Sequence, residues 1–135
     1  MVGPRNRENI APVTVVTVAQ ELEANKMHVL SEMAGVGAIA LTLPTDPEVG
    51  DFVGVFSIRE SGFTVVHPDV EVGDDFYLAM GSGAVRTTPN TGTMTSPVTD
   101  HERNDFQAVY MGEVTFPVAG KLWVIISMSA NFTLA

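Results

Sequence analysis

Two short acidic loops are the stretches of this sequence whose residue types could hold a metal ion. The first carries Asp46, Glu48 and Asp51, and the second runs D-V-E-V-G-D-D over residues 69–75. Calcium loops space their oxygen ligands at alternate positions and often close with a bidentate Glu. Pro47 interrupts the first loop, and the second lacks the closing Glu. We interpret both as turns between strands, in which Asp, Pro and Gly set the backbone angles, with a weak calcium site as the alternative.

The other reactive residue types do not form a recognisable catalytic or metal-binding pattern. His28, His67 and His101 are scattered, and none has a second His at metal-ligand spacing. The chain has no Cys, which excludes thiol catalysis and thiolate metal sites. The 16 acids offer many pairs for glycosidase chemistry, but Trp123 lies in an apolar strand and is expected in the core. We therefore predict no catalytic, cofactor or metal residues.

Composition and charge narrow the possible partners. The chain has 135 residues, 45% of them hydrophobic and 17% charged, which suits one globular domain. So low a charged fraction suggests that a partner covers part of the surface. The net charge is −9, and eight of the 16 acids lie between Asp46 and Asp75. Such a surface repels phosphate backbones and anionic lipid, so we expect neither nucleic acid nor membrane as a partner.

The elements that would position these residues are mostly β-strands. Short runs rich in β-branched and aromatic residues alternate with turn signals every 8 to 15 residues. This spacing predicts an all-β fold, an antiparallel β-sandwich or jelly-roll-like barrel with an irregular N-terminal arm. The expected strands are 13–18, 38–43, 52–58, 63–66, 76–80, 84–87, 106–116 with a bend at Gly112, 121–128 and 131–134.

Three segments depart from this strand pattern. Residues 1–11 are polar with no apolar period, so we expect an arm ahead of a single β-domain at 12–135, and no signal peptide is visible. Residues 88–104 hold two Pro and five Thr and are expected to form a long exposed loop open to a partner. Residues 19–34 are ambiguous. Their apolar spacing slightly favours a helix, and a short strand over 27–30 is the alternative.

Several stretches resemble small phage virion proteins of the capsid-decoration or fibre type. They are V-T-V-V-T-V at 13–18, H-V-L-S-E at 28–32, A-L-T-L-P at 40–44, V-G-D-F-V-G-V-F at 49–56 and G-K-L-W-V-I-I-S at 120–127. The likeness covers residues 13–58 and 119–128 and leaves the middle of the chain unmatched. It makes residues 28–30 a strand, and we adopt that prediction over the helix because Val29 then faces the same core as the following strands.

The resemblance implies binding without catalysis. Such proteins sit on the outside of a capsid shell, often as trimers, and hold neighbouring coat subunits together. The implied partners are the major capsid protein and further copies of this chain, and the implied location is the outer surface of the virion. Arg5 and Arg7 are the residues we nominate for contacts between the arm and the shell. Two alternatives are a receptor- or carbohydrate-binding module of a phage fibre and a small β-fold hydrolase.

Overall fold

The computed structural model of the chain is built from β-strands. It describes residues 13–30, 38–57, 62–68, 75–80, 85–96, 104–115, 119–129 and 132–135, and these contain strands and turns but no helix. In this part of the chain no helix is therefore long and apolar enough to cross a membrane. The predicted all-β class is confirmed.

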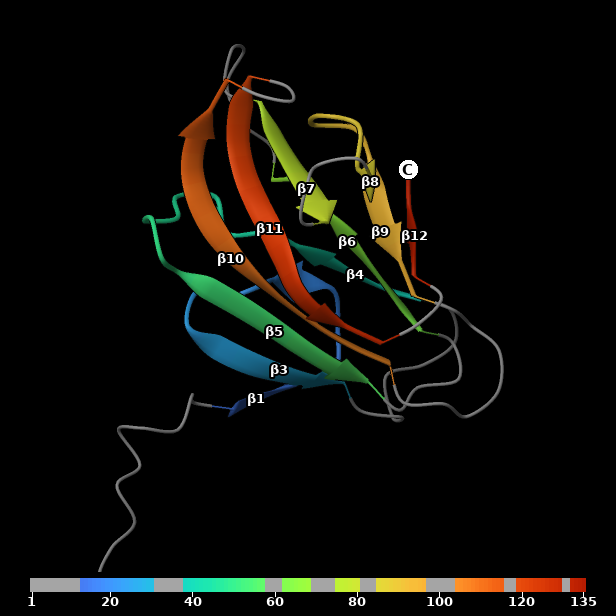
Figure 1. Ribbon diagram of the computed structural model, residues 1–135. Helices are drawn as coiled ribbons and strands as arrows, with labels where there is room; N and C mark the ends of the chain where they lie inside the picture. Colours follow the sequence, from blue (N-terminus) through green and yellow to red (C-terminus); the bar gives the residue numbers. More distant parts are fainter. Residues whose placement is uncertain are drawn as a thin grey trace, which may run out of the picture.

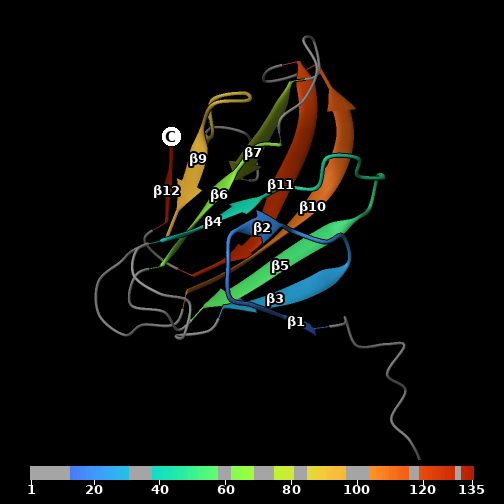
Figure 2. The same ribbon diagram turned by 180° about the vertical axis from the view of Figure 1, so that it is seen from behind.

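The strands form two sheets that pack against each other as a sandwich (Figure 1). The larger sheet has seven strands in the order β1-β3-β5-β10-β11-β7-β8, and the smaller has five in the order β12-β9-β6-β4-β2. Figure 1 shows the larger sheet in front, and Figure 2 shows the molecule from the side of the smaller sheet. The strands are β1 (Val13–Val16), β2 (Gln20–Glu21), β3 (Lys26–Leu30), β4 (Ile39–Thr42), β5 (Phe52–Ser57), β6 (Phe63–Val66), β7 (Phe76–Met80), β8 (Val85–Arg86), β9 (Thr93–Thr95), β10 (Asn104–Val114), β11 (Gly120–Met128) and β12 (Thr133–Leu134).

The core lies between the two sheets and follows the period-2 alternation of each strand. On β4, Ile39 and Leu41 point into the core, and Leu43 is buried beyond the end of the strand. On β10, Phe106, Ala108 and Tyr110 are buried at alternate positions. The sequence prediction for these strands is confirmed within one or two residues at each end.

The pairing of the strands is mixed rather than antiparallel. Strands β1, β3 and β5 run parallel to one another, as do β2, β4 and β6, and β11 runs parallel to β7. Antiparallel pairs join β5 to β10 and β10 to β11. The β-sandwich is therefore correct, but the expectation of a purely antiparallel one is wrong. Pairing partners depend on long-range packing, which the local pattern does not carry.

Three further expectations are corrected by the strands themselves. The strand adopted over 28–30 is confirmed as part of β3, and the helical alternative over 19–34 is wrong in its described part, because Gln20–Glu21 and Lys26–Leu30 are strands. The expectation that Val29 faces the core is wrong, because His28 and Leu30 are the buried side chains of β3 and Val29 lies on its other face. Asn25 takes a left-handed φ of 63° in the turn before β3. The expected long exposed loop at 88–104 is also wrong in part, because β9 lies within it and its Met94 side chain is fully buried.

Candidate interaction surface

The first acidic loop is a hydrogen-bonded turn between β4 and β5. The two carboxylate oxygens of Asp51 accept hydrogen bonds from the Glu48 backbone N–H at 2.9 Å and from the Asn25 side-chain amide at 3.0 Å. The Asp51 N–H donates back to the Glu48 carbonyl, and Gly50 supplies a left-handed φ of 93°. Because protein donors occupy Asp51, this geometry supports the turn interpretation over the calcium site.

This turn gives a first testable prediction. The Asp51→Ala substitution should lower the free energy of unfolding by about 1 to 2 kcal/mol, because it leaves two donors without an acceptor. The measurement is urea denaturation at fixed protein concentration, with Asp46→Ala, an exposed acid in the same loop, expected within about 0.5 kcal/mol of the wild type. Millimolar calcium should not shift the melting temperature. A calcium-dependent increase that Asp51→Ala abolishes would instead support the cation site.

The remaining predicted site residues are only partly within the described ranges. Asp75, directly before β7, accepts a hydrogen bond from the side-chain amide of Asn90 at 2.9 Å, and this bond joins it to the turn at Asn90. The other acids of the second loop, His101, and the nominated Arg5 and Arg7 lie outside the described residues. Among the described side chains, no group of three or more His, Asp or Glu is arranged to hold a metal ion.

His28 is a fully buried side chain on the inner face of β3 whose two ring nitrogens are both hydrogen-bonded. Its Nδ1 lies 2.9 Å from the Gly54 carbonyl oxygen, which can only accept, so Nδ1 carries the proton. Its Nε2 accepts a hydrogen bond from the Glu23 backbone N–H at 3.0 Å. These bonds fix the orientation of the ring, and the bond to Gly54 ties β3 to β5, which is a structural role.

His67 is buried in a different environment, just after β6. Its Nε2 lies 2.9 Å from the Thr87 hydroxyl, which also accepts a hydrogen bond from the Leu78 N–H. Among the described residues no partner is found for its Nδ1. Burial lowers the pKa of His67 from 6.5 to about 4, because the charged ring would lose its hydration. His67 is therefore neutral in the folded protein at physiological pH.

The depressed pKa of His67 predicts an acid-sensitive stability. Between pH 6.5 and about 4 the unfolded chain binds a proton at His67 that the folded chain does not. The stabilising contribution is complete above pH 6.5 and is lost as the pH falls toward 4, by up to about 3 kcal/mol. We expect His67→Gln, which does not titrate, to lose less stability over this window in urea denaturation at each pH. Parallel curves for the two proteins would contradict this assignment.

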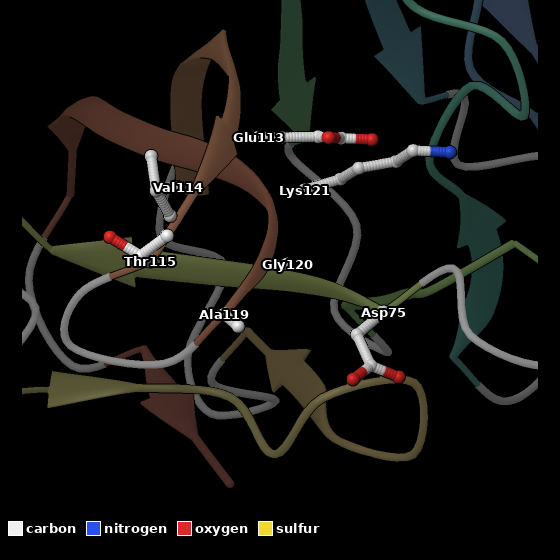
Figure 3. Close-up of a pocket in the computed structure, with 7 residues that line it drawn as sticks. All are labelled: Asp75, Glu113, Val114, Thr115, Ala119, Gly120 and Lys121. Carbon is white, nitrogen blue, oxygen red and sulfur yellow. The ribbon is translucent and has the colours of Figure 1, made fainter.

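A hollow of about 410 Å³ lies where β10 turns back into β11 (Figure 3). Its charged lining residues are Asp75, Glu113 and Lys121. Figure 3 shows the Asp75 carboxylate directed away from Glu113, so the two acids do not converge on one point. The Lys121 ammonium lies 5.1 Å from the centroid of the Phe76 ring, a cation–π contact that covers the end of the core. The hollow does not present a pair of carboxylates suited to glycoside hydrolysis.

The aromatic side chains that commonly stack on sugars are all buried. The single Trp and the two Tyr of the chain, Trp123, Tyr110 and Tyr77, are at most 5% exposed. The predicted core position of Trp123 is confirmed. A carbohydrate-binding module usually presents such rings on its surface, and this chain presents none of its Trp or Tyr rings there.

The most distinctive surface is the face of the larger sheet that points away from the smaller sheet, turned toward the viewer in Figure 1. Since Val53, Val55 and Trp123 point into the core, the residues that alternate with them point outward. We call this surface on β1, β3, β5, β10 and β11 the outer face. Its apolar side chains are Val13, Val15, Met27, Val29, Phe52, Phe56, Val109, Met111, Leu122, Val124 and Ile126.

The outer face is open and almost free of charge. The side chains of Val13, Val15, Met111 and Ile126 are 52–65% exposed, and the other apolar members are half-buried. From Val13 on β1 to Met111 on β10, Asp105 is the only charged side chain at the described outward positions of these five strands, and the exposed Glu113 follows Met111 at the end of β10. Contiguous apolar surface is uncommon on monomeric soluble proteins and is typical of sites of interaction.

Charged residues instead lie at the borders of the outer face. Near β1 and β3, Lys26 forms an ion pair with Glu23 at 3.0 Å, and this contact lowers the pKa of the Glu23 carboxyl. At the opposite side, the Arg86 guanidinium lies 6.0 Å from the centroid of the Tyr77 ring. An apolar centre with charged groups at its rim is the usual composition of a protein–protein interface.

Sequence reasoning did not locate the outer face. The signal was present in β5 and β11, where F-V-G-V-F and L-W-V-I-I are apolar at consecutive positions and not only at alternate ones. Strands that are apolar on both faces are normally covered on both faces. No known protein-family model matches the chain, and no curated protein sequence is detectably similar to it.

Proposed function

We propose that this chain is a structural virion protein that binds the outside of a phage capsid and stabilises or decorates the shell. The observation that carries the proposal is the outer face, eleven apolar side chains on five adjacent strands, with the charged Asp105 among them and Glu113 at the end of β10. A surface of this kind gains free energy by leaving water against another protein of the assembled shell, either the coat or a further copy of this chain. The function is therefore binding and mechanical support, without a chemical step.

The resemblance to small phage virion proteins supports the same function. Four of the five stretches that carry the likeness contain strands of the outer face, at residues 13–16, 28–30, 52–56 and 120–127. They contribute Val29, Phe52 and Ile126, among others, to its surface. The residues that give the likeness are thus also residues that would contact a partner.

The charge of the chain suits the outer side of a shell. A net charge of −9 would be repelled by packaged DNA on the inner side. We propose the major capsid protein as one partner, with the chain acting as a homo-oligomer of three copies. Arg5 and Arg7 remain our proposed contacts of the arm with the shell.

The test is to locate the protein on virus particles. Particles would be purified on a density gradient from the cells that carry this gene and treated with a gold-conjugated antibody against the chain. We expect gold over the outer surface of the shell, no gold on particles from a gene deletion, and release of DNA at a lower temperature from those particles. Absence of the chain from intact particles, or labelling confined to the tail, would contradict the proposal.

A further inference from the structure

We propose that the outer face is the contact between copies of this chain, with three outer faces turned toward a common axis. This inference rests on the proposed function, from which the number of three copies is taken. It adds which surface of the chain holds the copies together. Two partners, the coat and a second copy, could cover an apolar face. Three observations on the described residues select the second copy: the charge of the face, its width and its position beside an open edge.

Charge is the first observation. Copies that each carry a net charge of −9 repel one another wherever their acidic surfaces meet. On the outer face only Asp105 and, at the end of β10, Glu113 are charged among the described outward positions, so copies that meet there bring few like charges together. A partner with a basic surface would instead be attracted to the acidic parts of the molecule. The outer face is therefore the surface best suited to an equally acidic neighbour.

Width is the second observation. The face is open on five strands, because on the next strand, β7, the outward side chains of Tyr77 and Ala79 are already buried. Five strands spaced about 4.8 Å apart span about 19 to 24 Å. If three sheets of that width form the three sides of a triangular prism, each sheet lies about 6 Å from the central axis. Side chains reach about 5 Å from a sheet, half of the usual distance of about 10 Å between stacked sheets, so three such faces fill their common core.

The open edge is the third observation. Strand β1 is the last strand of the larger sheet and pairs only with β3 among the described strands. Its outward Val13 and Val15 are 61% and 65% exposed, and the outward positions of this edge carry no Lys or Glu of the kind that discourages association. In a triangular arrangement the edges of neighbouring sheets meet at the corners, so this edge would lie against the next copy. The apolar surface therefore extends to β1, the edge strand that would contact the neighbouring copy.

Light scattering of the purified full chain tests the inference without any capsid. The wild type should have about three times the 14.4 kDa mass of one chain, and should keep it in about 0.5 M NaCl, because apolar contacts are not screened by salt. Val15→Asp and Ile126→Asp place a carboxylate at exposed positions of the face and should give the mass of one chain. Val85→Asp is the matched control, since Val85 is 50% exposed on the opposite edge strand of the same sheet, and should keep the wild-type mass.

Circular dichroism of each variant shows whether it is folded. We expect unchanged spectra, because the substituted side chains are exposed within one chain. A wild type with the mass of one chain, or an oligomer that persists in both Val15→Asp and Ile126→Asp, would overturn the inference. Either result can occur while the chain still binds capsids, which would assign the face to the coat protein. Conversely, a stable trimer that is absent from virus particles would overturn the proposed function and leave this inference standing.

Discussion

The Phe106→Ala substitution should lower the free energy of unfolding by about 3 to 5 kcal/mol. Phe106 is fully buried on β10, and its ring lies 6.1 Å from that of Phe63 on β6, which belongs to the opposite sheet. Phe132 packs edge-on against both rings at centroid distances of 5.6 and 6.4 Å. Removing the central ring leaves a cavity at the point where the two sheets meet. Small domains are stable by only about 5 to 15 kcal/mol, so this variant should be close to unfolding.

Urea denaturation at one fixed protein concentration measures this loss, since association of copies would otherwise change the apparent stability. The Phe106→Leu variant is the control, because it keeps an apolar side chain at the same position and should cost only about 1 to 2 kcal/mol. Equal stabilities for the Ala and Leu variants would mean that the sheets do not pack over this ring.

The Gly92→Ala substitution should be the second large effect, at about 3 kcal/mol. A Cβ at this position would lie 2.2 Å from the Ala135 carbonyl oxygen and 2.3 Å from the Thr88 nitrogen, and backbone atoms cannot rotate away. The Ala135 carbonyl accepts hydrogen bonds from the N–H groups of Thr88 and Thr93. A methyl group at Gly92 would therefore displace the end of the chain from β9.

Gly50→Ala is the matched control for Gly92→Ala. Gly50 has a φ of 93°, but a Cβ there would meet no atom within 4 Å. Only backbone strain is added, at about 1 to 2 kcal/mol. Thermal or urea denaturation of the two variants separates crowding from strain. A smaller loss for Gly92→Ala than for Gly50→Ala would contradict the close packing of the chain end against this turn.

Strands with a single buried face were the part of the fold that the sequence predicted well. In β4, the alternation of Ile39 and Leu41 with smaller or polar residues marks one inner face, and in β6 the alternation of Phe63 and Val65 with Thr64 does the same. β-branched and aromatic residues bounded by Gly and Pro are sufficient to locate such strands. The predicted boundaries of these two strands therefore agree closely with those in the structure.

Strands β3 and β9 have no clear alternation in the sequence, so β3 was predicted only from the resemblance and β9 was missed. In β3, Met27 and Val29 lie on the outer face while His28 and Leu30 point inward, so apolar residues occur on both faces and the period of two is hidden. In β9, Met94 is the only apolar residue between two threonines. That strand exists because β6 and β12 pair with it on either side, which are contacts distant in sequence.

The composition predicted a surface covered by a partner, but it did not predict where an apolar surface would lie. A charged fraction of only 17% suggested that a partner hides part of the molecule. The position depends on which strands become neighbours, since the outer face gathers β1, β3, β5, β10 and β11 from distant parts of the chain. The first acidic loop is a turn at Asp51, as predicted, and the Asp51 carboxylate accepts hydrogen bonds from Glu48 and Asn25.

Oxidation of methionine by hydrogen peroxide, followed by mass spectrometry, tests most directly whether another protein covers the outer face. Two methionines of the unmodified chain are compared. Met111 lies on the outer face and is 52% exposed within one chain, and Met80 on β7 is 38% exposed. Peroxide converts an exposed thioether to a sulfoxide. If copies of the chain cover the face, Met111 should oxidise more slowly than Met80 in concentrated solution and faster after dilution or in Val15→Asp. Faster oxidation of Met111 than of Met80 at every concentration would contradict a covered outer face.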